Sequence, residues 1–235
     1  MSLAALRREY KLGNLDESDL HPDPLEQFNQ WFQQALEARG GSSRVRAFGI
    51  GIYKSFQSLL GAKPVDPHAI SLATADKDGR PSVRTVLLKG ADARGFIFFT
   101  NYESRKGREL AENPHAAIVI HWADVERQIC VTGTVTKLPK AESEAYFKSR
   151  PRGSRLAAWV SKQSTVVPGR EFLEQQMAEV AAKYSSDVPM PDYWGGFVLA
   201  PSEIEFWQGR PSRLHDRLRY ARQPDGSWKH ERLSP

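Results

Sequence analysis

The most informative stretch of this chain is EFWQGRPSRLHDR, which runs from Glu205 to Arg217. It decides the fold because an apolar strand, 204–208, leads straight into a turn that gathers three arginines and one histidine. A second cluster of aromatic residues and glycines, YWGGF at 193–197, comes just before it. Flat rings, glycines and cations suit a pocket for a planar ring and a phosphate. The alternative interpretation is a plain strand pair closed by a basic turn.

The length and charge of the chain limit its class. A chain of 235 residues makes one large domain or two small ones. A net charge of +5 and a pI near 9.3 favour anionic partners: nucleic acid, an acidic membrane surface or phosphorylated metabolites. The sequence contains no long Lys/Arg run, which argues against a nucleic-acid-binding arm.

Cysteine and apolar content indicate the compartment. The single cysteine, Cys130, cannot form an intramolecular disulfide, and its apolar neighbours predict a buried structural thiol. The N-terminus lacks the apolar core of a signal peptide, and no apolar run reaches the ~20 residues of a membrane span. We therefore expect a cytoplasmic protein without a membrane span. The six histidines lack metal-ligand spacing, so we expect no metal site.

Hydrophobic periodicity predicts a mainly β fold with inserted helices (α+β). A helix is expected at about 24–38, and a hairpin turn at 76–79 joins the first two strands. Mostly antiparallel strands with helices between them favour a closed or half-closed barrel, and no Gly-x-Gly-x-x-Gly follows a strand. The expected strands are 69–75, 82–89, 95–100, 116–122, 127–137, 195–200, 204–208, 214–220 and 228–233, and the later helices are 104–112, 142–149, 154–161 and 171–184.

Two N-terminal segments do not fit that pattern. Residues 1–23 are polar and are expected to be flexible. The segment 40–64 has no acidic residue, and its apolar side chains recur on one helical face. It could cover one end of the barrel, lie on a membrane or partner as a basic amphipathic helix, or stay disordered.

Two segments offer anion sites. In the first, TNYESRKG at 100–107, Ser104 is expected to cap a helix whose first turn carries Arg105 and Lys106. In the second, Tyr146, Arg150 and Ser154 are spaced by four and four across a helix junction at Pro151, where they could converge on a phosphate dianion. A solvated basic turn remains the alternative for the first.

The strand and turn residues add further candidates. Alternation places Arg84, Val86 and Leu88 on one face of their strand and Thr85, Leu87 and Lys89 on the other. Arg213 and His215 are expected to point to one side of an extended segment, where a fixed cation and an imidazole could assist proton removal. A histidine beside arginines is otherwise a plain surface residue.

Four blocks, at 84–89, 104–106, 146–154 and 205–217, resemble in order those of the pyridoxine/pyridoxamine 5'-phosphate oxidase family. The resemblance covers roughly 3–39 and 66–235. It implies an FMN-binding split β-barrel that forms a homodimer, with one domain at 24–235 preceded by a lid at 1–23. The segment 40–64 then looks like an insertion, and 194–235 corresponds to the dimerisation and substrate region.

The activity that this resemblance implies is oxidation of pyridoxamine and pyridoxine 5'-phosphates to pyridoxal 5'-phosphate, in vitamin B6 biosynthesis and salvage. FMN accepts the hydride, and O2 reoxidises it to give H2O2. A flavin reductase on the same barrel, or a non-catalytic binder of pyridoxal phosphate, FMN or nucleic acid, remains an alternative.

The resemblance also carries over site residues. Arg213 and His215 correspond to the catalytic residues. The flavin contacts correspond to Arg84, Thr85, Val86, Leu87, Leu88, Lys89, Phe99, Thr100, Arg105, Lys106, Gln128, Gln163, Ser164, Trp207 and Arg217. The substrate contacts correspond to Arg7, Arg8, Glu9, Tyr10, Lys89, Tyr146, Arg150, Ser154, Arg213, Leu214 and His215. The family often has tyrosine where Phe99 stands, so only a backbone contact would survive there.

Overall fold

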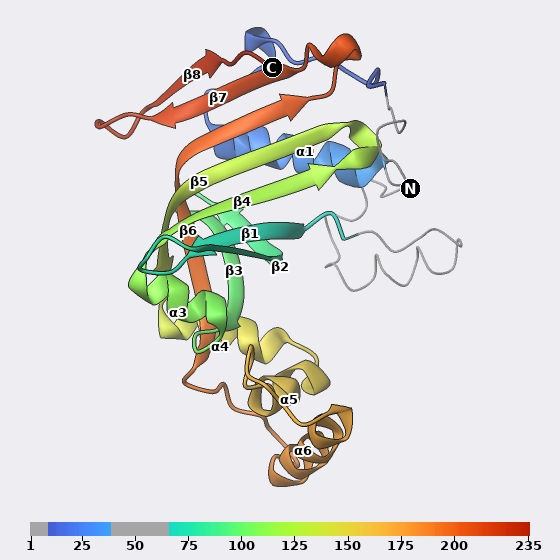
Figure 1. Cartoon of the computed structure of the whole chain (residues 1–235), viewed down its shortest axis with the longest axis vertical. Coiled ribbons are helices and arrows are strands. Elements are labelled where there is room, and N and C mark those ends of the chain that lie inside the picture. The colour runs from blue at the N-terminus through green and yellow to red at the C-terminus, as the bar shows by residue number, and fades with distance from the viewer. Residues whose placement is uncertain (1–8, 39–65) are drawn as a thin grey trace. The chain divides into compact units, whose positions relative to one another are not determined.

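The computed structural model describes residues 9–38 and 66–235 (Figure 1). The segment 40–64 and residues 1–8, on which two of the predictions above fall, lie outside the described residues. The helices are α1 (Pro24–Ala38), α3 (Arg105–Glu112), α4 (Lys140–Ser149), α5 (Arg152–Val160) and α6 (Arg170–Lys183), with 3-10 turns η2 (Glu17–Asp19), η4 (Ala123–Val125) and η5 (Pro211–Arg213). The strands are β1 (Ala69–Ala75), β2 (Pro81–Asp92), β3 (Gly95–Asn101), β4 (His115–Trp122), β5 (Arg127–Lys137), β6 (Trp194–Gln208), β7 (Asp216–Arg222) and β8 (Trp228–Arg232).

The eight strands form one sheet that closes into a barrel. Their order is β3-β2-β1-β4-β5-β6-β7-β8, and an additional pairing of β3 with β6 closes the first six strands. The pairs β2–β3, β3–β6, β6–β7 and β7–β8 are antiparallel. The prediction of a mainly β barrel with inserted helices is confirmed.

Strand β6 differs from the sequence prediction of two short strands. It is one strand of 15 residues, and the expected break at 201–203 is absent. Its first part pairs with β3 as far as Leu199, and its last part pairs with β7 from Glu203 onward. Pro201 lies between these two paired parts, so its missing N–H interrupts neither of those two ladders.

The turn before β7 also differs from the prediction. We expected an extended segment from Leu214, but β7 begins at Asp216. Pro211 instead opens the 3-10 turn η5, in which Ser212 and Arg213 adopt φ values of 57° and 63°. Two consecutive left-handed residues reverse the chain, so strand alternation cannot align Arg213 with His215.

The described residues group into two compact units. The first combines the N-terminal segment up to Ser71 with Ile118–Thr132 and Pro201–Pro235. Its core forms where the buried face of α1 meets the sheet. Trp31 packs edge-on against Phe206 of β6, with ring centroids 5.1 Å apart, and Phe28 packs against Trp122 of β4 at 6.3 Å. The periodicity that predicted this helix therefore marks its buried face.

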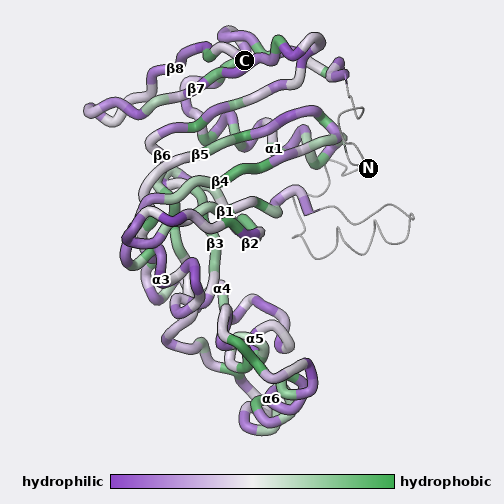
Figure 2. Tube along the Cα trace, viewed as in Figure 1, coloured by the Kyte–Doolittle hydropathy of each residue, from purple (hydrophilic) through white to green (hydrophobic). Residues whose placement is uncertain are grey.

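The second unit comprises Leu72–Ala117 and Gly133–Ala200. Its helical part is held by a cluster in which Phe147, Ala158 and Trp194 are buried. The hydropathy-coloured trace shows apolar residues along α5 and a largely hydrophilic β8 in the other unit (Figure 2). The glycine pair after Trp194 permits close packing, because a Cβ at Gly195 would lie 2.0 Å from the hydroxyl oxygen of Tyr102.

The described part of the N-terminal segment is anchored within the first unit. The backbone N–H groups of Lys11 and Leu12 donate to Glu126 Oε2, at 2.7 and 2.9 Å. Leu15 is buried, and its N–H donates to Asp216 Oδ2 at 3.1 Å. Residues 9–16 are thus attached to the turn that follows β4 and to the start of β7. The domain boundaries given by the resemblance remain a prediction.

No helix within 9–38 or 66–235 is long and apolar enough to cross a membrane.

Candidate functional site

The N-terminus of α3 is built as the sequence predicts. Ser104 caps the helix: its Oγ accepts from the N–H of Gly107 at 3.3 Å and donates to the carbonyl oxygen of Asn101 at 2.7 Å. A Cβ at Gly107 would lie 2.1 Å from the carbonyl oxygen of Tyr102, so the chain can make this tight turn only with glycine. The cap therefore fixes the first turn of α3, which carries Arg105 and Lys106.

Lys106 is a buried cation. Its Nζ donates to Thr100 Oγ1 at 3.0 Å, to Ser104 Oγ at 3.1 Å and to Gln163 Oε1 at 2.7 Å, and all three acceptors are uncharged. Burial lowers the pKa of Lys106 to about 8; the charge of Arg84 acts in the same direction and that of Glu109 against it. Three of the residues expected to contact flavin therefore meet here, although Gln163 is distant in sequence.

Two arginines beside Lys106 share one carboxylate. Arg84 Nη2 lies 3.2 Å from Glu109 Oε2, and Arg105 Nε lies 2.8 Å from Glu109 Oε1. Burial raises the pKa of Glu109, but hydrogen bonds from Ser82, Thr74 and Arg105 and the charge of Arg84 outweigh it and bring the pKa to about 2. The sequence analysis missed Glu109, although its i,i+4 spacing from Arg105 on one helix was a usable signal.

The expected alternation of side chains along β2 is seen only in its first half. Thr85 and Leu87 are exposed, Arg84 and Val86 are half-buried, and Leu88 is buried. The register of β2 against β3 then shifts between Leu88 and Gly90, so Lys89 is the extra residue of a bulge. A bulge re-aims side chains, and simple alternation therefore does not give the direction of Lys89.

A stack of aromatic rings lies beside Arg150. The rings of Phe99 and Tyr146 are 3.9 Å apart and nearly parallel, and Trp194 stacks on Phe99 at 5.6 Å. The Arg150 guanidinium lies 4.7 Å from the centre of the Trp194 ring. Its Nη1 is buried and has no hydrogen-bond partner among the described residues. Burial lowers the pKa of Arg150.

The predicted trio Tyr146, Arg150 and Ser154 is partly brought together. Pro151 separates α4 from α5, as expected, and Ser154 lies in the first turn of α5 with its N–H bonded to the Pro151 carbonyl at 2.9 Å. Burial raises the pKa of Tyr146, and the neighbouring charge of Arg150 lowers it. Tyr146 and Arg150 are therefore electrostatic neighbours, while Ser154 lies at the adjoining helix start.

In the first unit, three rings form what we call the aromatic cluster: Tyr10, Trp207 and His215. Tyr10 meets Trp207 and His215 edge-on, with centroids 5.5 and 5.6 Å apart, and Trp207 lies 4.7 Å from His215. His215 Nδ1 accepts from the N–H of Arg210 at 3.1 Å. We therefore infer that the neutral imidazole carries its proton on Nε2.

The residues between Arg210 and His215 project from this cluster. Arg213 and Leu214 are exposed, and the left-handed backbone at Ser212 and Arg213 is a strained conformation for side-chain-bearing residues. Strain of this kind clusters at functional sites. The predicted catalytic pair is thus presented by a turn, not by a strand.

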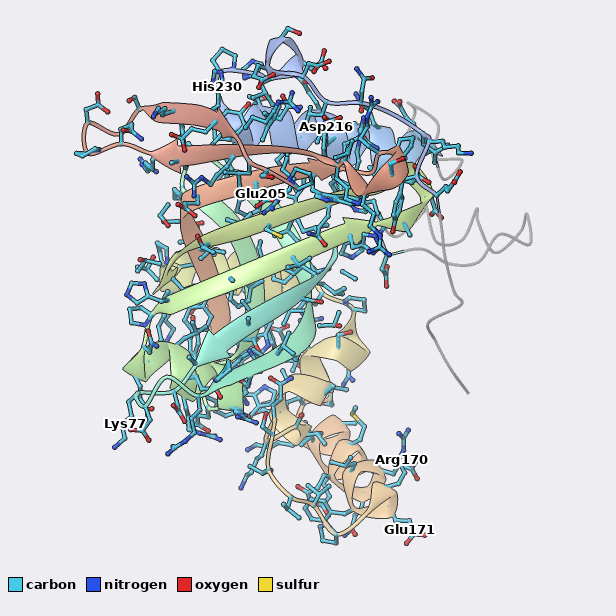
Figure 3. All side chains as sticks on the ribbon, turned by 45° about the horizontal axis from the view of Figure 1, so that its top comes forward. Lys77, Arg170, Glu171, Glu205, Asp216 and His230 are labelled. Atoms are coloured by element: carbon cyan, nitrogen blue, oxygen red, sulfur yellow. The ribbon has the colours of Figure 1, made fainter. Side chains whose placement is uncertain are left out.

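The predicted flavin contacts Gln128 and Arg217 lie near the single cysteine. Arg217 makes a bidentate pair with Glu205 of β6, with distances of 2.8 and 2.9 Å. Glu205 is labelled in Figure 3. Gln128 Nε2 donates to Cys130 Sγ at 3.3 Å. Burial and the charge of Glu205 raise the pKa of the Cys130 thiol. Glu205 is a second carboxylate partner that the sequence analysis did not identify.

The remaining predicted contacts are Ser164, Glu9, Arg7 and Arg8. Exposed Ser164 follows Gln163 with a φ of 72°. Glu9 is paired with Lys11 at 2.6 Å on the surface. Arg7 and Arg8 lie outside the described residues. No group of three or more His, Cys, Asp or Glu residues in the described ranges could hold a metal ion.

Comparison with known proteins identifies relatives along the whole chain. A family model described as pyridoxamine 5'-phosphate oxidase matches residues 62–184, and one described as the pyridoxine 5'-phosphate oxidase C-terminal dimerisation region matches 194–235. The chain is 52% identical over 233 residues to a pyridoxine/pyridoxamine 5'-phosphate oxidase of Cupriavidus taiwanensis, covering 99% of each chain. It is 49% identical over 234 residues to that of Paraburkholderia phymatum, covering 100% of this chain and 99% of the relative.

Solved structures give the same result for the fold. The crystal structure of PhzG from Burkholderia lata 383 in complex with tetrahydrophenazine-1-carboxylic acid matches with a TM-score of 0.76 and 31% identity, covering 93% of this chain and 95% of that one. A pyridoxamine 5'-phosphate oxidase-related, FMN binding protein from Nostoc punctiforme PCC 73102 matches with a TM-score of 0.63 and 17% identity, covering 92% of this chain and 100% of that one. The chain therefore belongs to the pyridoxamine 5'-phosphate oxidase family.

Proposed function

We propose that this protein is an FMN-dependent oxidase that converts pyridoxamine and pyridoxine 5'-phosphates to pyridoxal 5'-phosphate. One observation carries the proposal: the second unit holds two cationic sites, each suited to a phosphomonoester. One is formed by Arg84, Arg105 and Lys106, and the other by Arg150. An enzyme of this activity must bind two phosphomonoesters, the flavin nucleotide and the substrate.

The residues around α3 fit the phosphate of FMN. Lys106 is a buried cation bonded only to neutral oxygens in its three hydrogen bonds, and the capped start of α3 adds N–H groups and the positive end of a helix dipole. We assign Gln163 and Ser164 to the same nucleotide, with Thr85–Lys89 and Phe99 along its ring. FMN held there would supply the hydride acceptor for the C4' carbon of the substrate, with O2 as the final electron acceptor and H2O2 as its product.

Arg150 fits the phosphate of the substrate. Its buried Nη1 without a partner among the described residues leaves a donor of strong hydrogen bonds available. A buried donor left unpaired costs about 1–3 kcal/mol, so a bound phosphate oxygen would remove that cost. We assign Tyr146, Ser154 and Lys89 to the same phosphate.

Arg213 and His215 are assigned to the substrate carbon and its attached nitrogen or oxygen. The proton on His215 Nε2 follows from the hydrogen bond that Nδ1 accepts. An imidazole held in this tautomer can orient a substrate heteroatom or exchange a proton with it. We assign Tyr10 to a lid over the substrate that excludes water, and Gln128, Trp207 and Arg217 to the flavin.

The assembly and location follow from the same proposal. The match of 194–235 to a C-terminal dimerisation region supports a homodimer. The exposed face of β2, with Val83 and Leu87 at 70% and 38% exposure, is apolar surface that a second copy could cover. The single cysteine supports a reducing, cytoplasmic location.

The similarity to PhzG introduces a second candidate substrate class, a reduced phenazine carboxylic acid. Identity of 52% to a pyridoxine/pyridoxamine 5'-phosphate oxidase against 31% to PhzG favours the vitamin B6 esters.

The experiment is a purification followed by substrate comparison. The purified protein should be yellow or should turn yellow with FMN, and pyridoxamine 5'-phosphate should yield pyridoxal 5'-phosphate and peroxide in equal amounts. Flavin reduction by NADH without peroxide from pyridoxamine phosphate would point to a reductase. A colourless protein that does not bind added FMN would end the proposal.

A further inference from the structure

We propose that Glu109 is the positioning residue of the flavin-phosphate site: its carboxylate fixes the guanidinium groups of Arg84 and Arg105 so that both face one anion. We call Arg84, Arg105, Lys106 and Glu109 the phosphate cluster. The inference rests on the proposed flavin site, and it adds a residue that would not itself touch the flavin.

The first reason is how completely Glu109 is held. It is 5% exposed, and its Oε2 accepts from Thr74 at 2.5 Å, from Ser82 at 2.6 Å and from Arg84 at 3.2 Å. Its Oε1 accepts from Arg105 at 2.8 Å. These contacts join β1, β2 and α3, so one side chain sets the spacing of the two arginines on different elements.

Arg84 is also held by three residues of β1 and β2, two of which contact Glu109 as well. Its Nη1 donates to the Leu72 carbonyl at 3.2 Å and to Thr74 Oγ1 at 2.5 Å, and its Nη2 donates to Ser82 Oγ. Thr74 and Ser82 are also donors to Glu109. A guanidinium whose orientation is fixed in advance loses less entropy when it binds an anion.

The second reason is the charge of the cluster. Three cations and one carboxylate leave a net charge of +2, which complements a phosphomonoester of about −1.5 to −2 at neutral pH. Without the carboxylate, three cations at a partly buried site would repel one another before any ligand arrived. The carboxylate therefore keeps the cations assembled in the empty site and still leaves a surplus for the ligand.

A purely structural role for Glu109 would explain the same distances. The structural role and the positioning role differ in what loss of Glu109 does to flavin binding. A structural role predicts that loss of Glu109 weakens the fold and all flavin binding alike. A positioning role predicts that the loss falls on the phosphate, so that FMN binding suffers and riboflavin binding does not. Riboflavin carries the same ring system without the phosphate and is the discriminating ligand.

The test is flavin titration of the apoprotein of wild type, Glu109→Gln and Glu112→Gln, followed by fluorescence quenching. Glu112 is an exposed glutamate on the same helix and gives a matched control. We expect Glu109→Gln to weaken FMN about tenfold or more, because charge-assisted hydrogen bonds to the phosphate are lost. Riboflavin affinity should change less than about twofold in both variants.

A milder variant keeps the inference testable if Glu109→Gln does not fold. Ser82→Ala removes one donor to Glu109 Oε2 but keeps every charge, and it should weaken FMN by roughly threefold with riboflavin again unchanged. Equal losses for FMN and riboflavin, or no loss of FMN affinity in either variant, would overturn the inference. Wild-type protein that binds FMN but fails to oxidise pyridoxamine phosphate would contradict the proposed activity and leave the role of Glu109 standing.

Discussion

The phosphate cluster of the second unit and the aromatic cluster of the first hold their candidate site residues in different ways. In the phosphate cluster, Arg84, Arg105 and Lys106 each make hydrogen bonds or ion pairs within the protein. In the aromatic cluster, His215 is held by the rings of Tyr10 and Trp207 and by the N–H of Arg210, and the neighbouring Arg213 is exposed on a left-handed turn. The first arrangement is complete before a ligand binds, whereas the second leaves its cation available.

The difference matches the lifetimes of the two ligands in the proposed reaction. A prosthetic group stays bound through many turnovers, so a site fixed in advance by ion pairs and a helix cap is favourable. A substrate must enter and leave in each turnover, and a site closed by an aromatic residue from the N-terminal segment can open. Substitutions in the two clusters should therefore separate flavin binding from turnover.

The largest effect is expected for Arg213→Leu. Loss of this cation should lower kcat/KM for pyridoxamine 5'-phosphate by roughly 10²-fold or more, within the range for groups that act on the transition state. FMN affinity should stay within about twofold, because the phosphate cluster is intact. The measurement is peroxide formation together with flavin titration, with the exposed Arg222→Leu on β7 as control. Unchanged peroxide formation from pyridoxamine 5'-phosphate would show that Arg213 takes no part in the reaction.

Arg150→Met should have the second largest effect. It tests whether the second unit contains a substrate site as well. Removal of the guanidinium should raise KM for pyridoxamine 5'-phosphate by about 10- to 100-fold, the cost of one to two charge-assisted hydrogen bonds. Turnover with unphosphorylated pyridoxamine should hardly change, since it lacks the group that Arg150 would bind. Equal losses for the two amines would show that Arg150 only stabilises its helix junction.

The sequence predicts the elements of this fold well where the signal is local. The helix at 24–38 and the strands at 69–75 and 127–137 have the predicted bounds, because their hydrophobic periodicity reports their own burial. The break in β6 and the extended form of 214–215 were wrong. In β6 the outcome depends on which strands pair on either side of Pro201, and no local pattern contains that information.

In the candidate site, too, the sequence predicts the local features and not those that depend on tertiary contacts. The cap at Ser104 and the helix break at Pro151 follow from local residue preferences. The meeting of Thr100, Lys106 and Gln163 was expected only from the family resemblance, because these residues are brought together by tertiary folding. The partners Glu109 and Glu205 were missed, since an acid at an anion site makes sense only once the arginines that it holds are known.

A third prediction concerns pH and the phosphate cluster. The pKa of Lys106 is about 8 in the ligand-free protein, and a bound phosphate would raise it. Lys106 must therefore be protonated for tightest binding, so FMN affinity should be constant below pH 8 and fall by up to about tenfold per pH unit above it. The second phosphate ionisation, near pH 6, lies below this window. Titrations between pH 7 and 9 measure the effect.

Two comparisons isolate Lys106 as the titrating group. The pKa of the neighbouring Glu109 carboxyl, about 2, lies far below this range. Lys106→Met should bind FMN weakly with a flat profile over this range. Riboflavin should give a flat profile with the wild type. A fall of the same size for riboflavin, or for Lys106→Met, would place the titrating group elsewhere.

The smallest effect is expected for Gly209→Ala in the aromatic cluster. A Cβ at Gly209 would lie 2.7 Å from Cγ and Cδ1 of Tyr10, so the tyrosine ring must shift from its present contacts with Trp207 and His215. We expect KM for pyridoxamine 5'-phosphate to rise a few-fold, with FMN affinity unchanged. The exposed Gly169→Ala, where a Cβ meets open space, is the control.

A double-mutant cycle shows whether that effect passes through Tyr10. In a Tyr10→Gly background the three atoms nearest to the added methyl group, Cβ, Cγ and Cδ1 of Tyr10, are absent, so Gly209→Ala should raise KM no further. The coupling between the two substitutions should therefore equal the whole effect of Gly209→Ala in the wild type. Additive effects would mean that the substitution disturbs the turn at 210–215 directly, and that the aromatic cluster does not depend on the N-terminal segment.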